Sequence, residues 1–240
     1  MFKPGEDLLG QYHELDGTIE FYGRINSIIN KNHKVLDLGA GRGAWFYEDQ
    51  CDFRKNLRNL KNKASHVIGA DIDEAVLSNP TNHENIIIKD GKIPLEDNTI
   101  DIIIADWVLE HVGNPKEFYD EIDRILKEGG IFCARTPHKY KYVSLMASLI
   151  KNKHHSKILK IIQPSRKEID TFPTVFKLNT IKSLKKYFKS YENYSYLYMS
   201  HPSYYGNNKL LFKIFSLIHN YLPKVFVSEI FVFFKKKNII

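Results

Sequence analysis

The sequence predicts an α/β fold built on a doubly wound, mostly parallel sheet of seven strands. Apolar strand segments and helical segments alternate five times between residues 34 and 135. The segment Ile100–Asp106 is an almost continuous apolar run, which is typical of a strand buried on both faces. A glycine-rich turn follows the first strand directly. Since ligands of such sheets bind beyond the carboxyl ends of the strands, we expect the site at that edge.

The first part of the chain supplies five of these strands. Residues 1–30 carry apolar residues at roughly helical spacing and predict a helical lead-in. Asn114-Pro115 begins the helix before the fifth strand, because proline is favoured in a first turn, and Gly129-Gly130 ends it. We expect strands over residues 34–38, 66–71, 85–89, 100–106 and 131–135, with helices over 44–63, 73–78 and 114–127.

Residues 137–178 interrupt the alternation after the fifth strand. An insertion at this place covers the strand ends, so we expect a helical lid over the substrate. Two strands and two helices follow, and the first helix is capped by Asn179-Thr180. They are expected over residues 181–189 (helix), 191–199 (strand), 207–222 (helix) and 225–234 (strand). No linker or repeat marks a boundary, so residues 1–240 are interpreted as one domain.

The chain is basic, with 35 Lys and Arg residues against 28 Asp and Glu residues and a formal net charge of +7. The excess is concentrated in residues 151–167 and 177–189. A basic surface indicates an anionic partner, such as a phosphate, a nucleic acid or an anionic membrane face. Solvated lysines that only keep the protein soluble explain the charge equally well.

The two cysteines and the N-terminus indicate a cytoplasmic protein. Cys51 and Cys133 are far apart, and residues 1–7 lack the apolar core of a signal peptide, so free buried thiols are expected. Residues 210–234 are apolar on average, but Pro223 and charged residues interrupt them before the roughly 20 residues that a membrane span needs. Lysines beside aromatic residues leave peripheral contact with the inner face of a membrane open.

The turn Gly39-Ala40-Gly41-Arg42-Gly43 follows Asp37-Leu38 at the end of the first strand. Glycines remove the Cβ atoms that keep backbone N–H groups away from a ligand, and the spacing fits the loose dinucleotide pattern. Asp37 argues against a dinucleotide, because a carboxylate repels a pyrophosphate. It instead accepts hydrogen bonds from an ammonium group, directly or through water. The turn therefore predicts a ligand with a cation where a dinucleotide carries phosphates.

Residues 35–135 resemble a class I S-adenosylmethionine-dependent methyltransferase of the small-molecule branch, similar to methyltransferase type 11. Five features in the family's order carry the resemblance, and they are the turn after Asp37, Asp71-Ile72, Asp90-Gly91, Asp97 to Asp106-Trp107, and Gly129-Gly130. The resemblance implies a Rossmann-like fold, with S-adenosyl-L-methionine as cofactor and S-adenosyl-L-homocysteine as product. The cofactor-binding residues that it implies are Asp37, Gly39, Ala40, Gly41, Asp71, Ile72, Asp90, Gly91, Asp106 and Trp107.

Several of these residues also fit structural roles. Asp71 pairs with a ribose diol, with Ile72 against the adenine, or it caps the following helix. Asp90 accepts from the adenine amine or forms an Asp-Gly turn, and one residue can do both. Trp107 lies against the cofactor or fills the core, and Asp101 is interpreted as structural.

Candidates for catalysis and for substrate contact are few. His138 follows the fifth strand and His111 lies one turn after Trp107, so each is a candidate base if the acceptor is an alcohol. Tyr12 and His13 belong to the lead-in helix, which in similar enzymes folds over the cofactor. Arg166 in the lid is a candidate contact for an anionic substrate, although surface charge also explains it. A zinc site from His111, His138, His154 and His155 is not expected, because the spacing matches no known pattern.

Three functions remain open. The first is O-methylation of a small sugar or phosphorylated precursor of a bacterial surface polysaccharide, which rests on analogy and on a Lys-, Asn- and Ile-rich composition typical of a low-GC bacterial genome. The second is methylation of a lipid or quinone head group at a membrane surface. The third is S-adenosylmethionine binding without catalysis. A nucleic-acid acceptor is disfavoured, because the sequence has no appended binding module and no Asn/Asp-Pro-Pro-Tyr motif.

Overall fold

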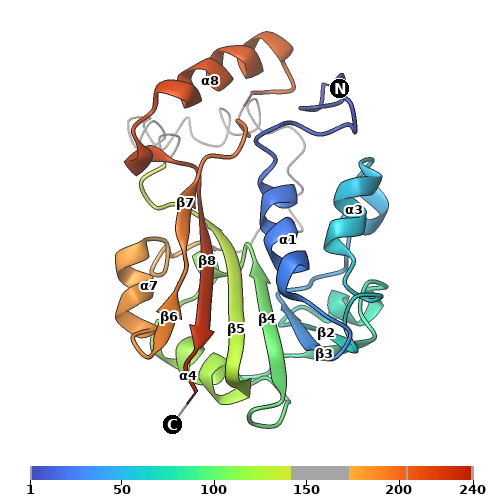
Figure 1. Ribbon diagram of the computed structural model, residues 1–240, viewed down its shortest axis with the longest axis vertical. Coiled ribbons are helices and arrows are strands. Elements are labelled where there is room, and N and C mark those ends of the chain that lie inside the picture. The colour runs from blue at the N-terminus through green and yellow to red at the C-terminus, as the bar shows by residue number, and fades with distance from the viewer. Residues whose placement is uncertain (1, 142–172, 204, 239–240) are drawn as a thin grey trace.

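The computed structural model describes residues 2–141, 173–203 and 205–238 (Figure 1). Its centre is a sheet with the strand order β3-β2-β1-β4-β5-β8-β6, and β7 also pairs with β8. The first five strands are parallel to one another, whereas β8 is antiparallel to β5, β6 and β7. Their bounds are β1 Lys34–Leu38, β2 His66–Asp71, β3 Glu84–Ile87, β4 Ile100–Asp106, β5 Leu126–Pro137, β6 Tyr191–Asn193, β7 Tyr196–Tyr198 and β8 Glu229–Lys236. The predicted mostly parallel, doubly wound sheet is confirmed.

The single strand expected over residues 191–199 is two short strands in the structure. β6 and β7 pair with β8 in one register, with Asn193 opposite Phe234 and Tyr196 opposite Phe231. Between them, the Ser195 N–H donates to Asn193 Oδ1 (2.8 Å), and Ser195 Oγ accepts from the Phe233 N–H (3.0 Å). Side chains thus replace part of the backbone ladder. The sheet has eight strands, and two of them share its seventh position.

Helices cover both faces of the sheet, because side chains alternate between its faces along each strand. Helix α1 (Gly17–Ile28) packs Phe21 and Ile25 into one core with Val35 and Phe231. Helices α4 (Pro115–Ile125) and α7 (Ile181–Tyr187) pack into the other core with Leu36, Ile103 and Phe132. The remaining helical elements are α2 Trp45–Glu48, α3 Asp52–Arg58, α8 Lys209–Tyr221 and the 3-10 turns η1 Glu74–Ser78, η2 Leu109–His111 and η4 Lys224–Phe226.

Capping residues set where the helices begin. Asp16 Oδ1 accepts from the N–H groups of Thr18 (2.9 Å) and Ile19 (3.1 Å), so α1 begins at Gly17. Residues 2–16 precede α1 in turns and irregular structure. Tyr12 and His13 were expected in a helix, and this prediction is wrong. Asn114 caps α4 and Pro115 is its first residue, as the sequence predicts. The Thr180 side chain caps α7 in the same way.

Two strands, β5 and β8, begin several residues away from their expected starts. α4 ends at Ile125 rather than at residue 127, since Leu126 already pairs with Ile100, and Gly129 at φ +73° lies inside β5. The last strand begins at Glu229 rather than at residue 225, because Pro223 starts the short turn η4, where its carbonyl accepts from the Phe226 N–H (2.9 Å).

Helix α8 lies beyond the carboxyl end of the parallel strands, apart from the sheet (Figure 1). It buries Phe212 and His219 and exposes most of its other apolar side chains. Within the described segments, no helix has the length and apolar character needed to cross a membrane.

The expected lid falls largely outside the described residues, which end at 141 and resume at 173. Both flanks of this segment are held at the end of β5. The His138 N–H donates to the Ser228 carbonyl (2.9 Å), and Asn179 Nδ2 donates to the Pro137 carbonyl (2.9 Å). The Val175 N–H donates to the Glu110 carbonyl (2.8 Å). The described residues on both sides of this segment therefore lie beside the strand ends.

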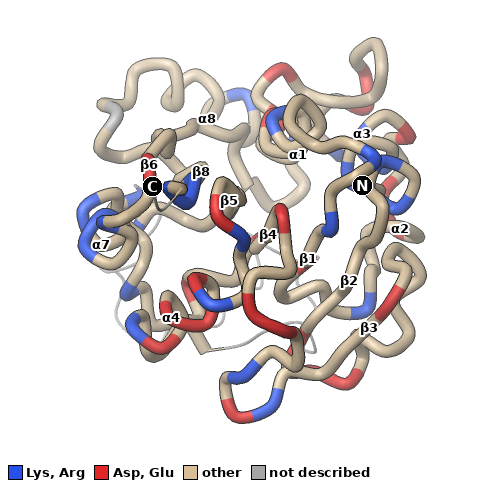
Figure 2. The backbone as a smooth tube through the Cα atoms, turned by 60° about the horizontal axis from the view of Figure 1, so that its bottom comes forward, with Lys and Arg blue, Asp and Glu red and all other residues tan. Residues whose placement is uncertain are grey.

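The lysine-rich stretch after residue 177 becomes α7. Figure 2 shows its basic residues gathered on that helix, at the side of the sheet. None of the α7 lysines lines the large cavity described next. The stretch 151–167 lies outside the described residues.

Candidate active site

A cavity of about 1300 Å³ lies at the carboxyl ends of the parallel strands. One end is lined by Gly39, Gly41, Asp71, Ile72 and Gly91, and the other by His201, Ser203, His219, Ser228 and Glu229. Pockets for one small ligand commonly measure about 300–1,000 Å³. The cavity is therefore large enough for a nucleoside-like ligand and a second small molecule.

The glycine turn forms the first end of the cavity. Gly39 (φ +74°) and Gly41 (φ +51°) both have left-handed backbones, which glycine adopts without strain. A Cβ atom on Gly39 would lie 2.4 Å from Val108 Cγ2, whereas one on Gly41 would meet nothing within 4 Å. Asn79 Nδ2 holds the turn by donating to the carbonyls of Ala40 and Gly41 (3.0 Å each). Gly39 is thus required by packing, and Gly41 faces open space where a ligand fits.

Asp71 braces the turn from the end of β2. Its Oδ2 accepts from the Gly41 N–H (2.9 Å) and its Oδ1 from the Asp73 N–H (3.0 Å). The cap of η1 is Asp73 rather than Asp71, because Asp73 Oδ1 accepts from the Ala75 N–H (2.9 Å). Each Asp71 oxygen keeps a second lone pair for a ligand hydroxyl. Ile72 follows, lines the cavity and has 65% of its surface exposed, and its contact with an adenine stays a prediction.

Asp90 and Gly91 form a tight turn. Both have positive φ (+49° and +71°), and the Lys92 N–H donates to the Lys89 carbonyl (2.8 Å). Gly91 lines the cavity, but the exposed Asp90 does not. Of the two roles predicted for Asp90, the structure shows the turn. Its contact with a cofactor stays a prediction.

Asp106 is held by a buried ion pair. Arg135 Nε and Nη2 donate to its two oxygens (2.8 and 2.9 Å), and the Tyr22 hydroxyl lies 3.3 Å from Oδ2. Asp106 does not line the cavity, whereas the next residue, Trp107, does. Trp107 has φ +63°, is 40% exposed, and has the Arg135 guanidinium 5.4 Å from its ring centroid. Its ring is thus presented to the cavity and does not fill the core.

Asp37 is the acid at this edge of the sheet that is best suited to bind a cation. It lies in β1 among residues packed against α1, and within the described part of the chain no hydrogen bond reaches its carboxylate. Burial raises the pKa of Asp37 to about 7, and the carboxylates of Asp106 and Asp71 add to the effect against the opposing charge of Arg58. A bound ammonium or sulfonium group would restore the charged form.

Asp101 has the structural role that the sequence predicts. Its two oxygens accept from the Lys34 N–H and from Lys127 Nζ (2.8 Å each). These bonds tie the entrance of β4 to β1 and β5.

The two candidate bases lie in different surroundings. His111 lines the cavity, and its Nδ1 is 2.8 Å from the Pro173 carbonyl. His138 is 5% exposed and does not line the cavity. Burial lowers the pKa of His138, and its ring lies against Tyr140 with the centroids 5.6 Å apart. The fold thus brings His111, not His138, to the site.

The expected substrate contacts do not reach the cavity in the described part of the chain. Tyr12 stacks on Phe53, with ring centroids 5.6 Å apart. His13 Nδ1 accepts from the Leu15 N–H (3.0 Å), and its ring lies 5.6 Å from that of His201, which does line the cavity. Arg166 lies outside the described residues.

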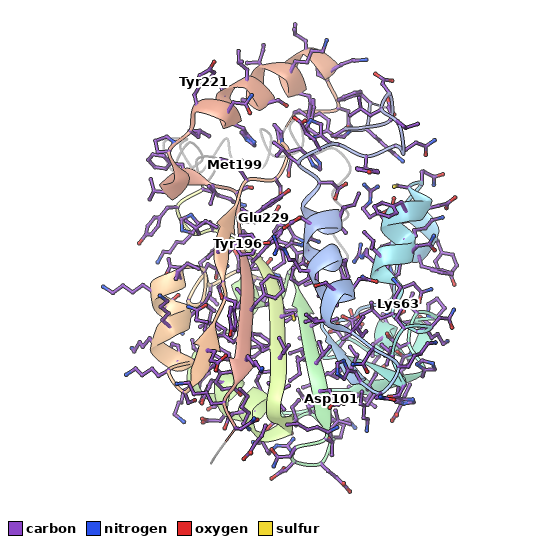
Figure 3. All side chains as sticks on the ribbon, viewed as in Figure 1. Lys63, Asp101, Tyr196, Met199, Tyr221 and Glu229 are labelled. Carbon is purple, nitrogen blue, oxygen red and sulfur yellow. The ribbon has the colours of Figure 1, made fainter. Side chains whose placement is uncertain are left out.

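The sequence patterns missed the second end of the cavity. Glu110 is 4% exposed and its Oε2 accepts from the Thr136 hydroxyl (3.0 Å), while burial raises its pKa. Glu229 begins β8 at the same edge, where it pairs with Pro137 (Figure 3). The only signal in the sequence is an acid at the start of an otherwise apolar strand.

Both cysteines are buried free thiols, as expected. Among residues 2–141, 173–203 and 205–238, no group of three or more His, Cys, Asp or Glu side chains is arranged to hold a metal ion.

The fold and the cavity have the features expected of a class I S-adenosylmethionine-dependent methyltransferase domain. The glycine turn, Asp71 at the end of β2 and Asp37 in β1 lie near one edge of the sheet, and its strand order is that of such domains. Residues 36–134 match the family model described as a methyltransferase domain, and this match supports S-adenosylmethionine as the cofactor.

Curated relatives match over less than half of this chain. A probable S-adenosylmethionine-dependent methyltransferase of Mycolicibacterium smegmatis is 31% identical over 112 residues, which are 45% of this chain and 39% of that protein. Demethylmenaquinone methyltransferase of Tropheryma whipplei is 27% identical over 123 residues, 48% of this chain and 47% of that protein. The chain thus matches less than half the length of either relative.

Solved structures resemble nearly the whole fold. The YcgJ protein of Bacillus subtilis superposes with a TM-score of 0.55 at 14% identity and covers 92% of this chain and 99% of its own. A putative sarcosine dimethylglycine methyltransferase from Galdieria sulphuraria gives 0.56 at 16% identity, covering 93% of this chain and 86% of its own. At these identities the likeness shows the fold alone.

Proposed function

We propose that the chain transfers a methyl group from S-adenosylmethionine to an oxygen atom of a small molecule. The observation that carries this proposal is one cavity that joins the glycine turn to a second, polar end. When bound, S-adenosylmethionine supplies an electrophilic methyl group on a sulfonium and is left as S-adenosylhomocysteine.

The first end of the cavity would hold the cofactor. Asp71 accepts from the ribose hydroxyls, and Ile72 lies against the adenine. Asp37 attracts the positive charge of the methionine part, and the space beside Gly41 admits its backbone close to the turn. Trp107 also lines the cavity. Much of the rate then comes from orientation, since holding two reactants in line is worth several kcal/mol, of the order of 7–11 in good cases.

A small sugar or phosphorylated precursor of a surface polysaccharide is the acceptor class that we favour. The second end is lined by hydroxyl-bearing, imidazole and carboxylate side chains, with Lys141 also in its wall. These groups suit a polyhydroxylated molecule. The α7 lysines do not line the cavity, which supports a small acceptor over a nucleic acid.

Calorimetric titration with S-adenosylmethionine tests the cofactor, and transfer of radiolabelled methyl groups tests the reaction. The acceptors to compare are glucose 6-phosphate, UDP-N-acetylglucosamine, catechol and duplex DNA. We expect binding, and transfer to a hydroxyl compound. Binding without transfer to any of them would favour the non-catalytic alternative, and absence of binding would refute both.

A lipid or quinone head group is the second candidate acceptor, and helix α8 supports it. The helix exposes an apolar stripe made of Leu210, Leu211, Ile214, Leu217, Ile218 and Tyr221, with exposed fractions from 41% to 81%. Figure 3 shows Tyr221 at one end of this helix. Lys213 is exposed beside the stripe, as on helices that lie in a membrane interface. His219 of the same helix lines the cavity, so a head group could enter from that side.

A further inference from the structure

Glu229 is a buried acid at the second end of the cavity (Figure 3). It is 5% exposed, and the five residues that follow it in β8, Ile230 to Phe234, are all buried and apolar. A buried carboxylate is costly unless it is paired or hydrogen-bonded. Its presence at the start of this strand therefore requires a partner.

Within the described residues, Glu229 Oε2 has no hydrogen-bond partner. Arg135 lies on the same face of the neighbouring strand, but its Nε and Nη2 donate to Asp106, and its Nη1 donates to Thr18 Oγ1 (2.9 Å). Ser200 Oγ lies beside Glu229 Oε2, yet neither atom makes a hydrogen bond of acceptable geometry. Burial raises the pKa of Glu229, and Arg135 and the nearby Ser200 hydroxyl oppose this effect, but no described group donates a well-aligned hydrogen bond to Oε2.

The small size of Gly17 creates the space for this carboxylate. A Cβ atom on Gly17 would lie 2.3 Å from Ser200 Oγ and 3.0 Å from Glu229 Oε2. Gly17 is the first residue of α1, where alanine would otherwise favour the helix.

The histidines at this end of the cavity are held neutral. His201 Nδ1 lies 3.2 Å from the Leu15 carbonyl, and His219 Nδ1 lies 3.1 Å from the Ser200 carbonyl, so each Nδ1 is the donor. Burial lowers the pKa of both, that of His219 to about 4. Neither imidazole therefore neutralises Glu229 at neutral pH.

Glu229 is also close enough to the cofactor end to meet an acceptor. It lies two strands from the end of β4, which carries Trp107. At about 4.8 Å per strand this is about 10 Å, the length of a small acceptor molecule.

We propose that Glu229 holds the hydroxyl group of the methyl acceptor and takes its proton. This inference rests on the proposed methyl transfer. As the acceptor oxygen bonds to the methyl carbon, the carbon–sulfur bond breaks with its electron pair left on sulfur. The hydroxyl proton passes to a Glu229 oxygen and later to water. The site therefore takes an alcohol or phenol hydroxyl, and any phosphate of the acceptor lies away from Glu229.

A crystal structure of the S-adenosylhomocysteine complex grown in glycerol tests the site without a known acceptor. We expect a glycerol hydroxyl within hydrogen-bond distance of the Glu229 carboxylate. A protein group bonded to both Glu229 oxygens, or glycerol absent from this end, overturns the proposal. In Gly17→Ala, the displaced carboxylate should no longer bind glycerol while S-adenosylhomocysteine remains bound.

Kinetics with whichever hydroxyl compound accepts the methyl group gives a second test. Glu229→Gln should bind S-adenosylmethionine within about twofold of wild type and melt at a similar temperature, but turn over at least about 10²-fold more slowly. Glu192→Gln, at an exposed acid of β6, is the matched control and should match wild type. Equal turnover in Glu229→Gln refutes proton transfer to this residue. Loss of S-adenosylmethionine binding by wild type would instead refute the proposed function.

The pH profile separates proton transfer from a structural role. The charged or titratable groups around Glu229 are Arg135, Asp106, Lys141, Tyr198, His201 and His219. If Glu229 accepts the proton, wild-type turnover falls below its pKa, and Glu229→Gln loses that acid limb. A limb that persists in the variant belongs to another group and contradicts the proposal.

Discussion

At the scale of single residues, the cofactor end of the site can be predicted from the sequence, because its side chains and its turn are neighbours in the chain. Asp37, Gly39 and Gly41 lie within five consecutive positions of the chain, so they stay close together in the fold. Asp106 could not be placed from sequence. Its ion pair with Arg135 joins two strands, and no local pattern reveals which acid finds a buried cation.

Binding of S-adenosylmethionine should weaken as the pH falls through 7. Burial raises the pKa of Asp37 from 3.8 to about 7, so the ligand-free carboxyl holds a proton over much of this range. A bound cation favours the ionised form, so binding releases that proton and affinity falls by up to about tenfold per pH unit. Calorimetry at pH 8, 7 and 6 measures this slope. Asp37→Asn should bind at least about tenfold more weakly at pH 8, with a flatter slope, and an equal slope would contradict the assignment.

The glycines of the turn should respond differently to alanine. Gly39→Ala places a Cβ atom against Val108 and should lower both the stability and the affinity for S-adenosylmethionine. Gly41→Ala meets no protein atom, so it should lose only the roughly 1–2 kcal/mol cost of a left-handed alanine. Its affinity for the cofactor should still fall at least about tenfold, because the new methyl group enters the ligand space. Urea unfolding and calorimetry on both variants separate the two effects. If Gly41→Ala and wild type bind S-adenosylmethionine equally well, the cofactor does not bind beside Gly41.

At the scale of elements, the order of strands and helices follows from hydrophobic periodicity, and the bounds follow from contacts that periodicity does not contain. α1 begins where Asp16 can cap it, although apolar spacing extends further back. β5 begins early because Leu126 finds Ile100 as its partner. The interruption between β6 and β7 depends on Ser195 facing Phe233, which lies in a strand much later in the chain.

Arg124 of α4 should stabilise the wall of the cavity. It donates to Glu121 Oε1 (2.7 Å) and to the carbonyls of Ile93 (3.0 Å) and Leu95 (2.7 Å). Arg124→Met leaves the buried Glu121 with only part of its bonding and should cost about 2 kcal/mol. Urea unfolding at pH 7 measures this. Lys116→Met, which breaks an exposed pair with Asp120, is the control and should cost below about 1 kcal/mol.

The loss of stability caused by Arg124→Met should be smaller at acidic pH. Burial alone would raise the pKa of Glu121, but hydrogen bonds from Arg124, the Ile93 N–H and Lys92 lower it to about 2. A depressed pKa stabilises the folded protein above pH 4.5, and this contribution is lost as the pH falls towards 2. The difference between wild type and Arg124→Met should therefore shrink from pH 7 to pH 3. A constant difference would show that the variant acts through packing.

At the scale of the whole molecule, the basic charge and the apolar stripe of α8 predict binding to anionic vesicles. Each Ile or Leu side chain that enters the interface contributes about 1.5–3 kcal/mol. Wild type should sediment with phosphatidylglycerol vesicles at low salt, and Ile214→Glu with Leu217→Glu should bind at least about tenfold more weakly. Tyr47→Glu with Leu77→Glu adds the same charge at exposed apolar residues elsewhere and should bind as wild type does. No sedimentation of wild type would remove the membrane head group as a candidate acceptor.

Strand β8 lies between β5 and β6, so the two ends of the cavity are built largely from different parts of the chain. The wall for the cofactor comes from residues before 137. Much of the wall at Glu229 comes from residues after 198, and β8, which carries Glu229, runs antiparallel to β5. The donor half and the acceptor half can therefore change independently in evolution. Exchanging the segment after residue 198 with that of a related enzyme should redirect the methyl group to a new acceptor and leave cofactor affinity as it was.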